Sequence, residues 1–372
     1  MRSLAKILHI SNFPPGPVLD GGTSRENALE QFLAGYGAKH IIVQDESFKR
    51  SKAQRLLRLS GIMDEIRAYR PDLVVLYYPS YPFFWQHKVT PYFWMSVLFA
   101  ELLRRASKKQ GFDIVIDIRD LPAFQYKDLG FPIEMKPGTL RWFDRFVFSR
   151  ANCLWVCSES IGHLVHECYG IAESRLITTL NGYRTPIKPS TDYGGRLKLA
   201  YAGSLNRERG IKTLIDSLFR SEIQDFELHL CGLYGDWILD EYKDSRLVFH
   251  GSLTNEQASS TLSQCHIGII PYPERGYYHL AYATKLSFYM GLGLPVLCSN
   301  AHETASHVRR LGVGLCRPMD DFDSAFQTLD NNRDQIKDWQ RRVLEVREEF
   351  SWHAIFARSL AETTNRCALT SP

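Results

Sequence analysis

Short apolar runs alternate with longer amphipathic stretches along almost the whole chain. Near-continuous apolar strands that alternate with helices are typical of parallel sheets, because the crossover helices cover both faces of the sheet. Helical patterns are found, for example, in residues 210–221 and 254–265. The predicted strands lie within residues 5–13, 38–44, 72–79, 112–120, 152–160, 174–182, 197–204, 226–232, 245–251, 265–272, 293–299 and 312–318. The pattern therefore predicts an α/β protein with two doubly wound, Rossmann-like halves.

The alternation of apolar and amphipathic segments stops between Asn181 and Gly195, where turn-forming residues cluster. A chain of 372 residues also exceeds the size at which one hydrophobic core usually keeps growing. We therefore expect a first domain over residues 1–186, a second over residues 187–350, and a final helix in residues 351–372 that packs back toward the first domain. Ligands of doubly wound folds bind beyond the carboxyl ends of the strands, so the candidate site residues should follow the strands.

Composition and charge narrow the possible partners. The first 185 residues carry 24 Lys and Arg against 18 Asp and Glu, a net charge of +6. Neither a recognition helix nor an RNA-binding signature accompanies this charge, so nucleic acid is not an expected partner, and a solvated basic face explains it as well. The eight cysteines include no CxxC pair and are expected to be buried free thiols. The first residues read as a strand and not as a signal peptide, which favours the cytoplasm.

A glycine turn follows the predicted strand that ends near residue 202. It contains Gly203 and Ser204 and continues through Arg207 and Arg209 into a helical stretch. Such a turn exposes backbone N–H groups at the positive end of a helix, which favours a phosphate, and an arginine can lie over a diphosphate. An ordinary strand-to-helix turn with solvated arginines explains the segment equally well.

Lys285 falls in the first turn of a predicted helix that ends near Gly291. A lysine there opposes the helix dipole unless an anion lies beside it, so its position indicates a phosphate partner. A solvated lysine is the alternative. Tyr289 on the same helix has the apolar neighbours Phe288 and Met290, which favour a core position.

In combination, these segments resemble the retaining GT-B glycosyltransferases of the family 4-like group. That group has a glycine turn followed by Lys-Gly or Arg-Gly and, later, a TKLFEYMALGKPV-like helix, and here YAGSLNRERGI and TKLSFYMGLGLPV stand in those places. The resemblance spans nearly the whole chain, and its further elements are Gly21-Gly22, residues 116–122, residues 158–160, Asn181-Gly182 and Phe350-Ser351-Trp352. It implies a GT-B fold, two Rossmann-like domains facing a central cleft, and a nucleotide diphosphate sugar as donor.

The resemblance also implies roles for individual residues. The residues implied to hold the donor diphosphate are Gly21, Gly22, Ser204, Arg209 and Lys285. Those implied at the nucleotide are Gly203, Ser287 and Tyr289. Two departures stand out: Ser204 replaces the usual arginine of the turn, and Leu280 and Phe288 replace the usual pair of glutamates. With these departures, the chain is more similar to the galactofuranosyl- and exopolysaccharide glucosyltransferase-like branches of the group.

Three further residues are candidates for catalytic roles, and one of them, Arg119, could pair with a phosphate or carboxylate group. Arg119 and Asp120 follow a predicted strand, where Asp120 could orient an acceptor hydroxyl, but a structural Asp–Arg pair is an alternative. Glu274 is the third candidate. No cofactor or metal is required, because cations and helix ends can stabilise a departing diphosphate. The DxD-like spacing of Asp321 and Asp323 is better explained as capping of the helix that follows.

The expected function is transfer of a hexose, UDP-linked and with retention, to a hydroxyl of a surface glycan or lipid-linked glycan. A non-catalytic nucleotide-sugar-binding partner of another transferase and a GT-B sugar-nucleotide epimerase remain alternatives. Aromatic residues between Tyr77 and Leu103, followed by Arg104, Arg105, Lys108 and Lys109, suit peripheral docking on an anionic membrane. The same stretch could instead be buried, and its apolar core is too short to span a bilayer.

Overall fold

The computed structural model describes residues 6–12, 14, 21–44, 52–83, 91–129, 135–190 and 192–370. Two compact units divide these residues. The described residues within Met1–Pro17, Gly22–Leu180 and Phe356–Pro372 form the first unit, and Gly21 with Asn181–Ile355 form the second. Each unit contains one six-stranded sheet in which all neighbouring strands are parallel. The predicted α/β class is confirmed, and each predicted strand segment contains an observed strand.

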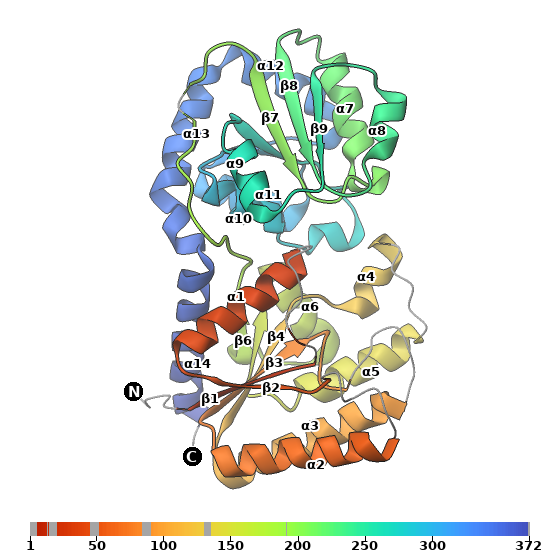
Figure 1. Ribbon diagram of the computed structural model, residues 1–372, viewed down its shortest axis with the longest axis vertical. Coiled ribbons are helices and arrows are strands. Elements are labelled where there is room, and N and C mark those ends of the chain that lie inside the picture. Colours follow the sequence, from red (N-terminus) through yellow and green to blue (C-terminus); the bar gives the residue numbers. More distant parts are fainter. Residues whose placement is uncertain are drawn as a thin grey trace. The chain divides into compact units, whose positions relative to one another are not determined.

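The first sheet has the order β2-β1-β3-β4-β5-β6 (Figure 1). Its strands are β1 (Ile7–Ser11), β2 (Lys39–Ile42), β3 (Leu73–Tyr78), β4 (Asp113–Ile118), β5 (Cys153–Val156) and β6 (Leu176–Thr178). The helices of this unit are α1 (Gly21–Gly35), α2 (Lys52–Tyr69), α3 (Pro91–Gln110), α4 (Pro122–Leu129), α5 (Pro137–Phe148) and α6 (Glu159–Tyr169). The inner strands β1, β3, β4 and β5 are buried almost throughout because helices cover the sheet.

The last helix, α14 (Trp352–Thr370), enters the first unit at Phe356. There the Phe356 ring lies 5.6 Å from Phe32 of α1 and 6.2 Å from Trp155 of β5, measured between ring centroids. The indole N–H of Trp155 also donates to Thr363 at 2.8 Å. The end of the chain therefore completes the apolar packing of the first unit.

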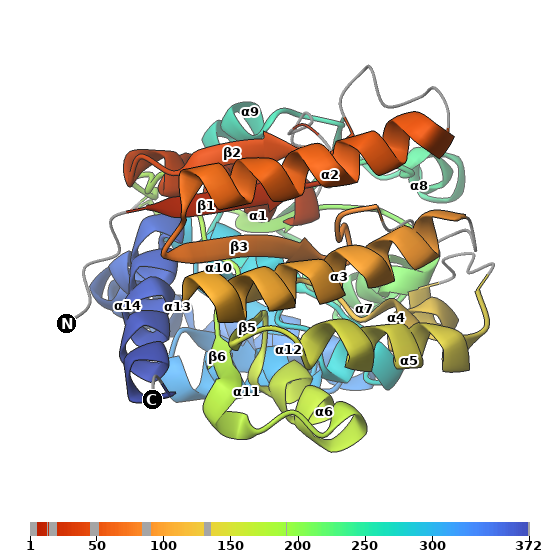
Figure 2. The same cartoon turned by 90° about the horizontal axis from the view of Figure 1, so that it is seen from below.

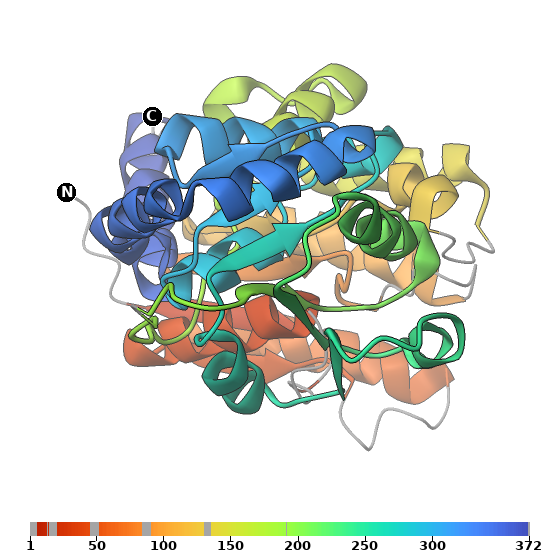
Figure 3. The same ribbon diagram turned by 90° about the horizontal axis from the view of Figure 1, so that it is seen from above.

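The second sheet has the order β12-β11-β10-β7-β8-β9. Its strands are β7 (Leu197–Ala202), β8 (Phe226–Cys231), β9 (Leu247–Gly251), β10 (Ile267–Ile270), β11 (Val296–Cys298) and β12 (Gly314–Cys316). The helices are α7 (Ile211–Arg220), α8 (Asp236–Glu241), α9 (Asn255–Leu262), α10 (Thr284–Gly291), α11 (His302–Leu311), α12 (Phe322–Asn331) and α13 (Arg333–Val346). Figure 3 shows these helices around the sheet from above.

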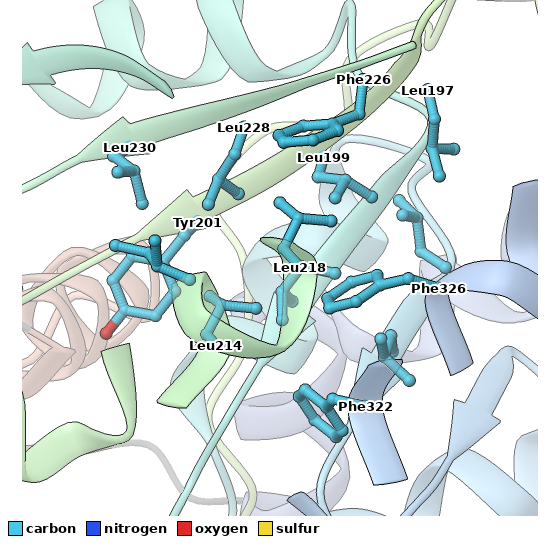
Figure 4. Close-up of a cluster of buried hydrophobic side chains, with 14 of the residues drawn as sticks. Leu197, Leu199, Tyr201, Leu214, Leu218, Phe226, Leu228, Leu230, Phe322 and Phe326 are labelled. Carbon is cyan, nitrogen blue, oxygen red and sulfur yellow. The ribbon is translucent and has the colours of Figure 1, made fainter. Parts of the chain in front are cut away.

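Alternation along β7 explains why both faces of this sheet are covered. Leu197, Leu199 and Tyr201 point to one side, where they pack with α7 and α12 in the buried cluster of Figure 4. On the other side, α10 lies so close that a Cβ on Gly268 of β10 would fall 2.4 Å from the Tyr289 ring. The second core therefore depends on large side chains on one face and on a glycine on the other.

Two expectations about side chains are met only in part. All eight cysteines are free, as expected, but Cys168 is exposed and Cys316 is only half-buried. The acidic run does lie at the start of α12, with Asp321 at the N-cap position and Asp323 in the first turn. The Asp321 side chain makes no cap hydrogen bond, however, and lies 3.7 Å from Arg317 in an ion pair.

Candidate functional site

The turn after β7 is shaped by Gly203, at the carboxyl edge of the second sheet. Its amide donates to the Cys231 carbonyl at 2.8 Å, which keeps the turn joined to β8. Its φ of +128° is a conformation that side-chain-bearing residues rarely adopt, and a Cβ there would lie 2.8 Å from Nζ of Lys285. The glycine therefore leaves room for the lysine directly against the backbone of the turn.

Lys285 is the second residue of α10, and only 9% of its surface is exposed. Its ammonium nitrogen lies 5.1 Å from the ring centroid of Tyr201 and 5.2 Å from that of Tyr272. Burial lowers the pKa of Lys285, Tyr272 acts to raise it, and Arg209 lowers it further. An anion beside this ammonium group would stabilise its charged form and would also suit the helix N-terminus.

The two arginines of the turn have different surroundings. Arg207 is exposed, bonds Glu241 at 3.0 Å and lies 4.2 Å from the Trp237 ring centroid. Arg209 is half-buried and close enough to Lys285 to lower its pKa. Arg209 is therefore the better placed of the two to share an anion with Lys285.

The side chain of Ser204 is able to form a further hydrogen bond. Its carbonyl accepts from the Tyr201 hydroxyl at 2.8 Å, whereas its own Oγ is buried and, within the described part of the chain, has no hydrogen-bond partner. A buried hydroxyl without a partner is costly, and a ligand oxygen would satisfy it. The structure thus places Ser204 in the same turn as Gly203 and Arg209.

Ser287 and Tyr289, expected at the nucleotide, have hydroxyl groups that already bond to protein. The Ser287 hydroxyl donates to the Asn181 carbonyl at 2.6 Å and lies 2.7 Å from the Tyr282 hydroxyl. The Tyr289 hydroxyl accepts from the Ala202 amide at 3.0 Å and is within 3.3 Å of two carbonyl groups in β7 and β10. Both residues are fully buried, so this geometry favours the core alternative for Tyr289.

Glu274 follows β10 and joins two other segments of the same edge. One of its carboxylate oxygens accepts from the amides of Asn300 at 3.1 Å and Met319 at 2.9 Å. These residues follow β11 and β12, so Glu274 holds the ends of three neighbouring strands together. A structural role is therefore established for one oxygen of this carboxylate.

In the first unit, Arg119 and Asp120 follow β4 at the carboxyl edge. The Arg119 guanidinium is half-buried, 3.8 Å from Asp120 and 3.9 Å from Glu26. Beneath them lies a fully buried ion pair that sequence reasoning missed, with Nε of Arg25 donating to Asp117 at 2.9 Å. Its partners are 92 residues apart in sequence. The glycines Gly21 and Gly22 begin α1, so they offer helix N-terminal amides and not a loop.

A second buried carboxyl group, Asp144 of α5, was also missed. The hydroxyls of Tyr78 and Tyr169 donate to it, the latter at 2.6 Å. Burial raises the pKa of Asp144 to about 7, and the two tyrosine hydroxyls oppose that rise. The only sequence signal was a charged residue within the apolar face of an amphipathic helix.

Within the described residues, no group of three or more His, Cys, Asp or Glu side chains is arranged to hold a metal ion. The same residues include no helix long and apolar enough to cross a bilayer.

Comparisons with known proteins agree with this architecture. Residues 199–363 match the family described as glucosyltransferase 3-like, C-terminal domain. Sucrose-phosphate synthase from Thermosynechococcus elongatus is similar in structure, with a TM-score of 0.67 at 16% identity over 98% of this chain and 100% of that one. HepE of Anabaena, solved with UDP, has a TM-score of 0.67 at 14% identity over 97% of this chain and 99% of that one. The lipopolysaccharide outer core galactosyltransferase WaaB has a TM-score of 0.60 at 13% identity over 98% of this chain and 99% of that one. No curated protein sequence matches the chain.

Two parallel sheets of this order, with such structural neighbours, define the class of fold: the chain has a GT-B fold. Within that fold, residues 199–363 of the second unit are similar to the glucosyltransferase 3-like C-terminal domain family. The GT-B fold implied by the resemblance, which the glycine turn and the TKLSFYMGLGLPV segment first indicated, is thereby confirmed.

Proposed function

We propose that this protein transfers a hexosyl group from a UDP-linked sugar to a hydroxyl of a surface glycan or lipid-linked glycan, with retention at the anomeric carbon. The observation that carries the proposal is the buried ammonium group of Lys285, held against Gly203 between Tyr201 and Tyr272. Retention is carried over from the family resemblance.

A diphosphate is the anion that suits this place best. Lys285 and Arg209 are near enough for one to lower the pKa of the other, a repulsion that a doubly charged ligand would reverse. Both cations would meet the charge that develops on the departing nucleotide diphosphate, which is how such groups accelerate transfer. The free Oγ of Ser204 would donate a hydrogen bond in place of the usual arginine.

The choice of uridine diphosphate as the nucleotide of the donor rests on analogy with a solved structure. HepE was solved with UDP, with UDP-glucose, and with UDP and glucose, and it has the same fold over nearly the full chain. Its identity to this chain is low, so the analogy supports the choice of UDP as the first donor to test and does not identify the sugar.

In the first unit, Asp120 is the proposed residue that orients the acceptor hydroxyl, and Arg119 is proposed to pair with a phosphate or carboxylate group. Arg119 lies 3.8 Å from Asp120, so the arginine can hold this carboxylate in position to accept a hydrogen bond from the acceptor hydroxyl. The N-terminal amides of α1 at Gly21 and Gly22 are a further proposed phosphate contact. Glu274 remains a proposed contact to the sugar through its second carboxylate oxygen.

One observation favours a second candidate, a nucleotide-sugar-binding partner without catalysis. Leu280 and Phe288 stand where the family has glutamates, and the neighbouring Ser287 hydroxyl is bonded to the Asn181 carbonyl and cannot substitute for them without breaking that bond.

Turnover by the purified protein separates the two candidates. Thermal shift across nucleotide sugars should first identify the donor, because ligand at about 100 times its Kd adds ~2.7 kcal/mol of stability. UDP release from that donor, with and without glycan acceptors, then tests transfer. Release by the protein alone supports the enzyme, whereas stabilisation without release under all conditions supports the binding partner.

A further inference from the structure

Three helices of the first unit leave large apolar side chains in water. Helices α2, α3 and α5 lie side by side on one face of its sheet (Figures 1 and 2). Leu57 of α2 is 70% exposed, Trp94 of α3 is 64% exposed and Trp142 of α5 is 47% exposed. Leu56 and Leu98 add to this apolar surface. Large apolar side chains left exposed on neighbouring helices are candidates for an interaction site.

The two tryptophans border an open hollow with an apolar floor. Their ring centroids are 6.4 Å apart, and the buried Phe93 lies 5.2 Å from Trp94 and 6.1 Å from Trp142. The hollow measures about 390 Å³ and is lined by these three rings with Gly138 and Thr139. Because buried aromatic groups support the indoles from below, both rings can face outward without loosening the core.

The charges beside the tryptophans are positive. Arg141 and Arg145 of α5 are exposed on either side of Trp142, whereas the acidic residue of this helix, Asp144, is buried. An outward face of tryptophan and arginine matches the water–lipid boundary, where indoles lie at the headgroups and cations meet lipid phosphates.

The basic cluster expected from sequence has a different position. Arg104 donates to Asn152 at 3.3 Å, and Arg105 pairs with Glu101 at 3.0 Å. Lys108 and Lys109 are exposed in the last turn of α3. The axial rise of a helix puts them ~20 Å from Trp94, about two Debye lengths at 0.1 M salt. This cluster is therefore not continuous with the exposed tryptophans.

We propose that Trp94, Leu98, Trp142, Arg141 and Arg145, here called the α3–α5 surface, dock the first unit onto an anionic phospholipid bilayer. The indoles insert at headgroup depth and the arginines contact lipid phosphates. Docking of this kind goes beyond the proposed transfer reaction, since it needs neither donor nor Lys285. It would bring the first unit to the level at which a lipid-linked acceptor is found.

Vesicle sedimentation of the full chain tests the proposal. We expect binding to phosphatidylglycerol vesicles that weakens with added salt, and little binding to phosphatidylcholine vesicles. R141S/R145S should bind about 25-fold more weakly, since each basic residue near anionic lipid contributes about fivefold. W94A/W142A should lose about tenfold or more, because two large apolar side chains no longer leave water.

Matched variants make the test specific. K108S/K109S removes the same charge from the other end of α3 and should keep its affinity within about threefold, given the screening over that distance. Lys285→Ala should bind vesicles as the wild type does even if transfer is lost. Unchanged melting temperatures should accompany the two double serine variants, because the four basic side chains that they replace are exposed.

Three results would overturn the proposal. One is no binding to phosphatidylglycerol vesicles at low salt. Another is an equal loss in both double serine variants, which would indicate a diffuse charge effect. The third is a wild-type dimer in light scattering that W94A/W142A dissociates while no vesicle binding is seen, which would assign the surface to a second copy of the chain.

Discussion

The ammonium group of Lys285 is positioned by neighbours that come from three separate segments. Gly203 leaves room for it, Tyr201 and Tyr272 flank it, and α10 places its stem. None of these neighbours is a carboxylate, so the immediate surroundings do not neutralise the lysine. Its chemistry at the scale of one residue is that of a buried cation that an anionic ligand would stabilise.

Replacing Lys285 should therefore affect turnover more than folding. We expect Lys285→Ala to reduce kcat by about 10² through lost stabilisation of the leaving diphosphate. Lys285→Met, which retains the volume, should show the same loss and separates charge from packing. Arg209→Ala should act similarly and also weaken UDP binding. Steady-state kinetics measure these effects, with the exposed Lys212→Ala as the control, and near-normal turnover of Lys285→Met would contradict the assigned role.

Asp144 makes a pH-dependent contribution to stability. Its pKa is raised by burial from 3.8 to about 7, so the folded state retains a proton that the unfolded state has lost. The contribution is complete below pH about 4 and is lost as the pH rises through about 7, with an upper value of about 4 kcal/mol. Asp144→Asn should flatten this dependence.

Urea unfolding between pH 4 and 8 measures the effect as the difference between wild type and Asp144→Asn. His9 titrates in the opposite direction, because burial lowers its pKa to about 3, so its charging in the unfolded state favours unfolding as the pH falls. His9 is present in both proteins and cancels in the difference. Parallel pH profiles of the two proteins would argue against the protonated carboxyl.

At the scale of elements, α10 is fixed by bonds at both ends of its short length. Asn181 donates to Thr284 at 3.2 Å and accepts from Ser287, while Tyr289 bonds the strands β7 and β10. Nearby, Tyr183 exchanges backbone hydrogen bonds with Phe350 and Trp352 at 3.1 Å and 3.0 Å. The Asn181-Gly182 and Phe350-Ser351-Trp352 segments, far apart in sequence, thus form one junction.

A substitution at Gly182 tests how much this junction contributes to stability. A Cβ at this position would lie 2.8 Å from the Trp352 amide nitrogen and 3.0 Å from the Phe350 carbonyl oxygen. Gly182→Ala should lower the free energy of unfolding by roughly 1–3 kcal/mol, since the backbone must shift to relieve the contact. Gly61→Ala in α2, where a Cβ meets nothing within 4 Å, should instead stabilise by about 0.4–1 kcal/mol. Denaturant midpoints measure both, and equal midpoints would show that the junction tolerates the added atom.

At the scale of the whole molecule, each unit has its own sheet and its own buried core, and the candidate groups lie at the carboxyl edges of both sheets. The proposed donor site relies on side-chain cations and helix N-termini to stabilise the diphosphate. These groups are built into the fold of the second unit.

Activity should accordingly survive removal of divalent metal. We expect EDTA to leave most of the turnover, because the charge that Mg²⁺ would supply comes from Lys285 and Arg209. The assay is UDP release in metal-free buffer, with a metal-dependent transferase treated in parallel as the control. Complete loss that added Mg²⁺ or Mn²⁺ restores would refute the prediction.

The amino-acid sequence by itself determined the class of fold and the strand positions, because apolar periodicity is a local property that each segment carries alone. It also identified the Gly203 turn and the lysine in the first turn of α10. Both are local features, a glycine after a strand and a cation at a helix start.

Only the tertiary structure decided which polar groups are already engaged. Arg207 pairs with Glu241, Ser287 with Asn181 and Arg25 with Asp117, and these partners are 34, 106 and 92 residues apart. The exposed Trp142 and the buried Asp144, two positions apart on α5, have opposite environments because the helix turns about 100° per residue and only one side meets the sheet. Burial and long-range pairing depend on which elements the topology brings together, and no single segment contains that information.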